Sequence, residues 1–371
     1  MRFTKYNSMR DILSWPGMQK YLRVFFSEDL LSLFPEEYED RPIAYVEQVA
    51  KTPWGDPFSV IADQLMDALG TILDIVDSKR LVCIPLWNPD GKCWTPEEDR
   101  LGGEHRVFLL APVIEPSMAK EKKPAVLICP GGGYEAVCFS GEGNPVRYFM
   151  EANGYRTFVL RYRVYPQSGG QEKDSNAQRY PDPQKDLTLA IMYLRAHAEE
   201  YGIDPEDFML FGASAGAHLC ALEAALYPTY EPMVREDIVL RMPQEASRYE
   251  SVGARPDKLC LCYPVISFEQ EPHEGSFQAL TGGREELRCA LSVERLVTGE
   301  YPKTFIWTVA DDDCVPPSNT LHMAESLEKH NVPYQMRVYR SGGHGCYLAF
   351  CKEARDWSND MLEFMKNQKE M

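Results

Sequence analysis

The sequence predicts an α/β fold in which a mostly parallel central sheet, covered by helices on both faces, follows a helical N-terminal extension. From about residue 104, short apolar runs alternate with amphipathic segments, which is the pattern of strand–helix–strand units. Before residue 100, apolar residues recur at helical spacing instead. We therefore expect a helical extension over residues 1–100 and the main α/β domain over residues 101–371.

The N-terminal extension predicts short helices followed by one longer helix. Ser8 and Asp11 have the spacing of a capping box, and Pro16 divides the apolar positions around it into two short segments. A longer helix is expected to start at Asp56, and its apolar stripe over residues 61–76 must be buried. The stripe could pack on the sheet as a cap, form a lid over a pocket or make a dimer contact, and the sequence leaves these three open.

The α/β region predicts seven strands, because each apolar run is short and is bounded by turn residues. The expected strands cover residues 106–110, 125–129, 156–160, 208–211, 258–261, 304–309 and 335–339. Helices are expected over residues 183–201 and 323–329. Residues 165–182, rich in Gly, Pro, Ser and Asn, are typical of an exposed loop.

The composition indicates a folded protein and disfavours nucleic acid and membrane surfaces as partners. Among 371 residues, 39 Lys and Arg against 56 Asp and Glu give a formal charge of −17, which repels phosphate groups. No apolar segment is typical of a signal peptide or a membrane helix. The eleven cysteines are odd in number and several lie in apolar runs. They indicate reduced thiols of a cytoplasmic protein, and their spacing predicts no metal site.

A serine between two glycines is the strongest chemical signal in the chain. Gly212, Ser214 and Gly216 form a Gly-x-Ser-x-Gly sequence that follows an apolar strand and opens a helix. Such a turn is so sharp that the positions two residues before and after the serine must be nearly free of side chains. The alternative is an ordinary glycine-rich turn. The flanking strand and helix favour Ser214 as a catalytic nucleophile.

A serine hydroxyl needs a base, and the base needs a carboxylate that fixes its tautomer. His344 lies in a glycine-rich loop after the last expected strand, where an imidazole can reach the carboxyl edge of the sheet. Asp311, Asp312 and Asp313 follow the penultimate strand, so the chain order is Ser, Asp, His. We favour Asp312 as the triad acid, with the other two as solvated or capping neighbours. No catalytic role is expected for the other six histidines. We expect His218 to be a buried packing residue, and ordinary helix or loop positions are expected for His105, His197, His273, His322 and His330.

A glycine run after the second expected strand predicts an oxyanion hole. The amides of Gly132 and Gly133, with the amide of Ala215 at the start of the elbow helix, could converge on one oxygen. The run lacks the Gly-x-Gly-x-x-Gly spacing of a dinucleotide site, and the chain has no Gly-Lys-Ser/Thr phosphate loop. Tyr134, next in the chain, either lines the substrate pocket or packs in the loop.

From about residue 106 to the C-terminus, these motifs resemble the α/β-hydrolase esterases related to acetylxylan and feruloyl esterases, within the hormone-sensitive-lipase-like and prolyl-oligopeptidase-like group. The resemblance rests on CPGGGY at 129–134, LRYR at 160–163, YPDPQKD at 180–186, FGASAGAHL at 211–219, ADDDCVP at 310–316 and GGHG at 342–345. In that family the acid is the Asp of an Asp-x-x-Val-Pro pattern, which here is Asp312. Pro130 stands where the oxyanion loop often begins with His, which favours the acetylxylan-esterase-like branch.

The resemblance implies a serine esterase that acts on short-chain esters, with acetylated carbohydrate as the leading substrate and no cofactor. The expected partner is a small ester, and a homo-oligomer is left open. Two alternatives remain: an arylformamidase-like amidase or prolyl-oligopeptidase-like peptidase with the same triad, and a non-catalytic binding protein of the same fold. Function depends on the pocket rather than on the fold, so the sequence does not decide among them.

Overall fold

The structure is a computed structural model, and it describes residues 3–26, 28–52, 57–88, 92–165, 178–348 and 353–366. Most of the loop expected over residues 165–182, the helix start expected at Asp56 and the last cysteine, Cys351, lie outside these residues. Among the described residues, no helix has the length and the apolar character needed to cross a membrane.

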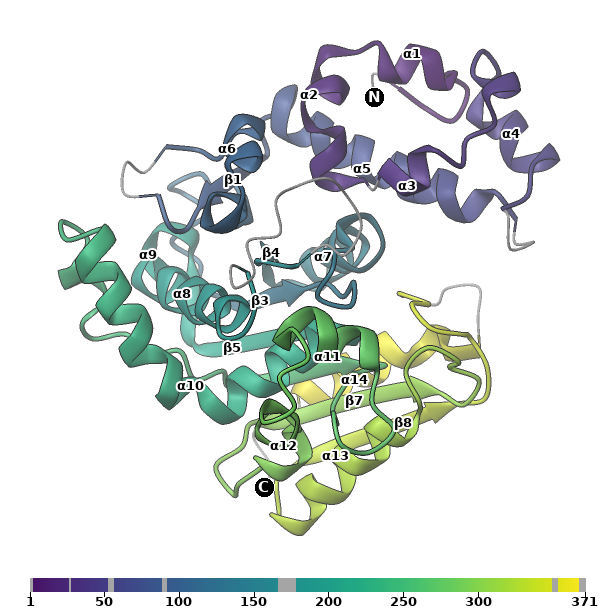
Figure 1. Ribbon diagram of the computed structural model, residues 1–371. Coiled ribbons are helices and arrows are strands. Elements are labelled where there is room, and N and C mark those ends of the chain that lie inside the picture. Colours follow the sequence, from purple (N-terminus) through teal and green to yellow (C-terminus); the bar gives the residue numbers. More distant parts are fainter. Residues whose placement is uncertain are drawn as a thin grey trace.

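Eight strands form one twisted sheet at the centre of the molecule (Figure 1). Its order is β1-β2-β4-β3-β5-β6-β7-β8. The first two strands run antiparallel to their neighbours and the other pairs are parallel. The strands are β1 (Leu81–Pro85), β2 (Phe108–Pro112), β3 (Lys123–Cys129), β4 (Arg156–Arg161), β5 (Ile203–Ala213), β6 (Lys258–Cys262), β7 (Lys303–Val309) and β8 (Tyr334–Tyr339).

All seven expected strands are present, with ends shifted by a few residues. Strand β1 was not predicted, and it lies inside the region expected to be helical. The strand ends at Pro85 and three of its five residues are only partly buried, as is typical of an edge strand with one neighbour. The division expected at residue 100 stays a prediction, although β1 pairs with β2 in the main sheet.

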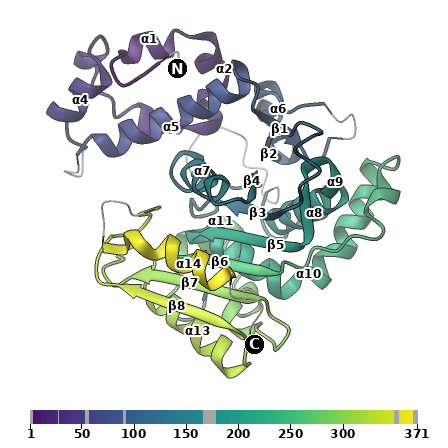
Figure 2. The ribbon, with the colours of Figure 1, turned by 180° about the vertical axis from the view of Figure 1, so that it is seen from behind.

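Side chains that alternate along the central strands enter two separate cores. Ala125 and Leu127 of β3 contact the core under α8, α10 and α13. Val126 and Ile128 enter the opposite core, under α5 (Ser59–Val76), α7 and α14. Figure 2 shows α14 lying across this second face. The helices of the α/β region are α6 (Pro96–Leu101), α7 (Asn144–Ala152), α8 (Asp182–Ala196), α9 (Ala198–Tyr201), α10 (Ser214–Arg241), α11 (Glu274–Thr281), α12 (Leu287–Ala290), α13 (Ser318–Lys329) and α14 (Trp357–Lys366).

Shorter turns complete the secondary structure. They are the 3-10 helices η1 (Glu36–Tyr38), η2 (Gly103–Arg106), η4 (Ala246–Tyr249), η5 (Val293–Arg295) and η6 (Glu353–Asp356), and the π-helix η3 (Phe139–Gly143). The single helix expected over residues 183–201 is divided at His197 into α8 and α9.

The N-terminal helices pack on the second face of the sheet and share its core. They are α1 (Met9–Leu13), α2 (Pro16–Phe25), α3 (Glu28–Leu31), α4 (Ile43–Val49) and α5 (Ser59–Val76). The expected capping box is present, because the Ser8 hydroxyl accepts the amide of Asp11 and the Asp11 carboxylate accepts the amide of Ser8. Ile61, Leu65 and Ile72 of α5 are fully covered by the chain itself, with α2, η3 and α7 as neighbours. The apolar stripe therefore needs no second copy to bury it.

Candidate active site

The turn between β5 and α10 has the geometry that the glycine spacing predicts. Ser214 begins the helix with a positive φ of 52°, a strained conformation for a residue with a side chain. A Cβ on Gly216 would collide with the carbonyl of Cys129, and a Cβ on Gly212 would collide with the backbone of Ala217. Only glycine fits at these two positions, and Ser214 is thereby lifted to the carboxyl edge of the sheet.

The structure brings Ser214, His344 and Asp312 together in one hydrogen-bonded chain. His344 Nε2 lies 2.9 Å from Ser214 Oγ, and His344 Nδ1 lies 2.8 Å from Asp312 Oδ2. The Asp312 side chain is fully buried, whereas 19% of the His344 side chain is exposed. A carboxylate accepts the Nδ1–H, so the Nε2 lone pair of a neutral ring faces the serine hydroxyl.

The neighbours of Asp312 hold it and its partner in place. Asp312 Oδ1 accepts the amides of Cys314 at 3.0 Å and Val315 at 2.9 Å, which leaves Oδ2 for His344. Asp311 is exposed, and its Oδ1 accepts the amides of Gly342 and Gly343 at 2.9 and 3.0 Å. The first aspartate of the run thus fixes the loop that carries His344, a role that the sequence did not predict.

Gly131, which directly precedes the two glycines predicted for the oxyanion hole, borders Ser214. A Cβ on Gly131 would lie 2.8 Å from Ser214 Cβ, so the backbone here passes directly beside the serine. Gly132 and Gly133 have positive φ angles of 123° and 65°, and within the described chain their amides have no hydrogen-bond acceptor. The amide of Ala215 lies in the first turn of α10, where amides have no acceptor in the helix. These donors can serve a developing oxyanion, and their role stays a prediction.

Glu142, which sequence reasoning missed, is buried beside this loop. Its Oε2 accepts the amide of Gly131 at 2.6 Å, and its Oε1 accepts the hydroxyl of Tyr263 at 2.9 Å. Burial raises the pKa of Glu142, and the two hydrogen bonds and a charged His344 oppose that change. The Tyr263 ring stands edge-on to His344, with the ring centroids 5.1 Å apart. In the sequence, Glu142 is one acid in a glycine-containing segment, and no spacing marks it.

Of the two alternatives that the sequence leaves open for Tyr134, pocket lining or packing, the structure shows a packed side chain. Tyr134 is 1% exposed, and its hydroxyl lies 2.9 Å from His218 Nδ1. His218 Nε2 in turn donates to the carbonyl of Leu291 at 2.9 Å. Burial lowers the pKa of His218 to about 4, so the ring is neutral and accepts the tyrosine hydroxyl. Tyr134 is therefore a packed core residue, and His218 is the buried packing residue that the sequence predicted.

Two further residues near the site were not expected there. His273, predicted as an ordinary loop position, lies 3.7 Å through Nε2 from the sulfur of Cys314 in the loop of Asp312. Tyr347, in the loop of His344, packs its ring against Gly141 and accepts a hydrogen bond at 3.1 Å from Gln64 of α5. The N-terminal helix therefore contacts the segment that positions the catalytic histidine candidate.

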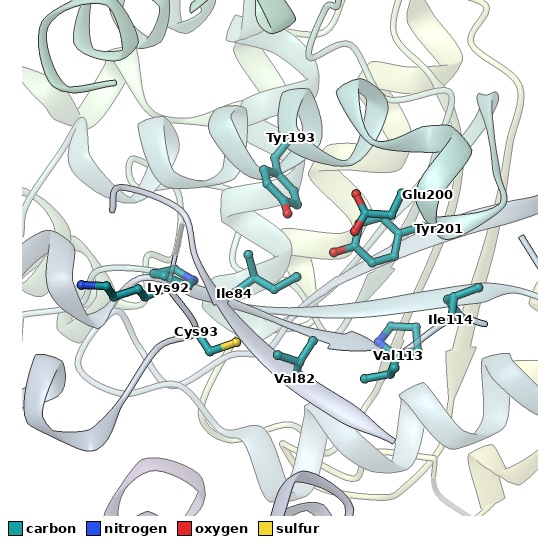
Figure 3. A pocket seen from close by; sticks show the side chains of 11 residues that line it. Val82, Ile84, Lys92, Cys93, Val113, Ile114, Tyr193, Glu200 and Tyr201 are labelled. Atoms are coloured by element: carbon teal, nitrogen blue, oxygen red, sulfur yellow. The ribbon is translucent and has the colours of Figure 1, made fainter. Parts of the chain in front are cut away.

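Hollows elsewhere on the molecule lie apart from the serine. A cavity of about 310 Å³ lies between β1, β2 and α8–α9, lined among others by Val82, Ile84 and Tyr193 (Figure 3). Because β2 is antiparallel to β4, the end of β2 at Pro112 is on the amino edge of the parallel strands, opposite Ser214. In the described part of the chain, no group of three or more His, Cys, Asp or Glu residues could hold a metal ion.

Comparison with known proteins agrees with the fold and places the chain in a family. The BD-FAE family profile matches residues 112–327, more than half of the chain. The chain belongs to the BD-FAE family. It is thus an α/β-hydrolase of the carboxylic-ester hydrolase group, as the motifs around Ser214 and Asp312 predicted.

The relatives of this BD-FAE chain include enzymes named for xylan and acetyl esters. It is 28% identical over 64% of its length to endo-1,4-beta-xylanase B of Butyrivibrio fibrisolvens, and 25% identical over 60% to an acetylxylan esterase of Xylanibacter ruminicola. It spans 34% and 40% of the length of those two proteins.

A solved structure covers the fold more fully. The acetyl ester-xyloside bifunctional hydrolase of Caldicellulosiruptor lactoaceticus matches with a TM-score of 0.59 and 30% identity, over 70% of this chain and 87% of that one. A carboxylesterase of Lactobacillus plantarum shares the fold with a TM-score of 0.55 and 24% identity, over 71% and 92% of the two chains.

Proposed function

We propose that this protein is a serine carboxylic-ester hydrolase that works through an acyl-enzyme at Ser214. The observation that carries the proposal is the unbroken chain of hydrogen bonds from Asp312 through His344 to Ser214 Oγ. Ser214 lies beside Gly131, the residue before the two glycines that we propose for the oxyanion hole. A binding protein needs none of these groups together, whereas acyl transfer needs all of them.

In the proposed mechanism, His344 Nε2 removes the proton of Ser214 as its oxygen attacks the ester carbonyl. The carbonyl oxygen becomes an oxyanion that the amides of Gly132, Gly133 and Ala215 stabilise. His344 then donates the proton to the leaving alcohol and the acyl-serine forms. Water deprotonated by His344 attacks this ester, and the acid is released with the serine restored. Asp312 stabilises the imidazolium in both halves of the reaction.

The substrate class that we propose is a short-chain ester, in particular an acetyl ester of a carbohydrate. The names of two similar proteins, an acetylxylan esterase and an acetyl ester-xyloside bifunctional hydrolase, support this class. So does Pro130 at the start of the oxyanion loop, because the sequence there resembles the acetylxylan-esterase-like branch.

The test is hydrolysis of p-nitrophenyl esters from acetate to octanoate, with Ser214→Ala beside the parent protein. We expect activity on the acetate and propionate that falls with chain length and drops by about 10⁴-fold or more in Ser214→Ala. Hydrolysis of acetylated xylo-oligosaccharides then tests whether the alcohol half of the substrate is a carbohydrate. Equal rates in both proteins would contradict the mechanism. Activity on aryl formamides or peptides alone would show that the protein is an amidase or peptidase and not an esterase.

A further inference from the structure

His273 bridges the two loops that border the predicted site. It lies in the segment between β6 and α11, directly before the helix. On one side its Nε2 lies 3.7 Å from Cys314 Sγ, and the Cys314 amide donates to Asp312. On the other side its Nδ1 lies 2.8 Å from the hydroxyl of Ser276. That hydroxyl is 3.9 Å from the place of a Cβ on Gly133. The imidazole thus stands between the acid loop and the oxyanion glycines.

The contacts of His273 fix which nitrogen carries its proton. Nδ1 accepts the backbone amide of Ser276 at 3.2 Å and so caps the start of α11. A nitrogen that accepts an N–H holds no proton, so the neutral ring is protonated at Nε2. Burial and the charge of a protonated His344 lower the pKa of His273, against the opposing effect of Asp312 and Glu274. The ring is therefore a neutral donor whose N–H points to the acid-loop side.

The only acceptor for this N–H among the described contacts is a sulfur. Thiol sulfur is a weak acceptor, and Cys314 is exposed, so a hydroxyl that enters from solvent would be a better partner. His344 must donate a proton to the leaving oxygen, which places the alcohol half of an ester on the His344 side of the acyl carbon. When that alcohol is a sugar, it carries further hydroxyl groups there.

We propose that His273 is a specificity-determining residue whose Nε2–H donates a hydrogen bond to a hydroxyl of the sugar half of the substrate. The inference rests on the proposed function and names the part of the substrate that this side chain recognises. The half-buried His273 caps α11, and this hydrogen bond holds the ring so that the donor is oriented before the substrate arrives.

The test compares two acetyl esters that differ in the alcohol. p-Nitrophenyl acetate has no hydroxyl on its leaving group, whereas acetylated xylo-oligosaccharides have several. In His273→Asn, a shorter side chain can still cap α11 but cannot reach the alcohol. We expect the ratio of kcat/KM for the sugar ester to that for the aryl ester to fall about tenfold, as for one lost hydrogen bond to substrate. His273→Gln, which keeps an N–H donor, should restore part of the ratio.

The matched control is His330→Asn, at the end of α13 and bonded within its own helix. Its ratio should equal that of the parent. Loss on both esters alike in His273→Asn would show a structural role, and an unchanged ratio would show no contact, so either result overturns the inference while the esterase proposal stands. A parent protein that cleaves the aryl ester but no acetylated sugar would refute the proposed substrate class, and this inference with it.

Discussion

At the scale of single residues, the roles of the three aspartates after β7 are set by what each carboxylate accepts. Asp312 is buried and serves His344 and two amides, Asp311 holds the glycine loop, and Asp313 is exposed. Three adjacent acids would repel one another if all were buried. Only Asp312 is buried, and its carboxylate is the one that lies next to the imidazole.

Replacement of Asp312 by Asn should abolish most of the activity. The Asn amide can present an N–H to Nδ1, which favours the tautomer with the proton on Nε2 and removes the base. We expect kcat on p-nitrophenyl acetate to fall by about 10⁴-fold with little change in KM. Asp313→Asn is the neighbouring control and should stay within about twofold. A larger loss in Asp313→Asn than in Asp312→Asn would identify Asp313 as the triad acid and contradict the assignment of Asp312.

Glu142→Ala should slow the reaction although the side chain touches no substrate. The change leaves the Gly131 amide without its acceptor and frees the loop that precedes the oxyanion glycines. A shift of about 1 Å at such a site costs about a hundredfold, so we expect kcat to fall between about ten- and a hundredfold. Glu142→Gln keeps an acceptor for the Gly131 amide and should retain most of the parent kcat. Unchanged kcat in the folded Ala variant would show that Glu142 is irrelevant to the site.

The sequence predicted Ser214, His344 and Asp312 because their chain order and their places after strands are local patterns. Glu142 and His273 escaped prediction because their partners are far along the chain. Glu142 meets Tyr263, and His273 meets Cys314, only once the strands align. Tyr134 adjoins the glycines in sequence, but its positive φ turns the ring into the core.

At the scale of elements, the central strands were predictable because both of their faces are buried and each is a continuous apolar run. Strand β1 has one neighbour, and its short apolar run closely follows the apolar stripe of a helix, so the spacing of apolar residues does not distinguish the strand from that helix. The sequence likewise did not predict the break between α8 and α9 at His197. What covers the stripe on α5 could not be predicted, because its neighbours α2, η3 and α7 come from separate segments.

The junction of α5 and α7 should make stability depend on pH. One carboxylate oxygen of Asp67 is buried without a hydrogen-bond partner among the described residues, and burial raises the pKa of Asp67 from 3.8 to about 7. The folded protein thus holds this proton more tightly than the unfolded chain. The free energy of unfolding should therefore fall as pH rises from about 4 to about 7, by at most about 4 kcal/mol.

Asp67→Asn, which cannot ionise, tests this expectation. Thermal unfolding should show a higher Tm than the parent at about pH 8 and a smaller difference at about pH 4. Asp63→Asn, on the exposed face of the same helix, is the matched control for loss of a carboxylate. A parent whose stability instead rises over this pH range relative to Asp67→Asn would show that the buried oxygen is stabilised as an anion.

At the scale of the whole molecule, one sheet edge collects every group that the proposed reaction needs. The serine follows β5, the acid follows β7, the histidine follows β8 and the oxyanion glycines follow β3. Parallel strands place these loops side by side, which is why ligands bind at this edge in open α/β sheets. The N-terminal helices cover one face and reach the histidine loop through Gln64 and Tyr347.

The most direct test of a nucleophilic Ser214 is labelling with a fluorophosphonate, which forms a stable covalent bond only with an activated serine. We expect one label per chain, mapped by peptide mass spectrometry to Ser214 and absent from Ser214→Ala. Labelling should be much slower in His344→Ala, because the base is gone. A label at another residue, or equal labelling of the parent and Ser214→Ala, would contradict the acyl-enzyme mechanism.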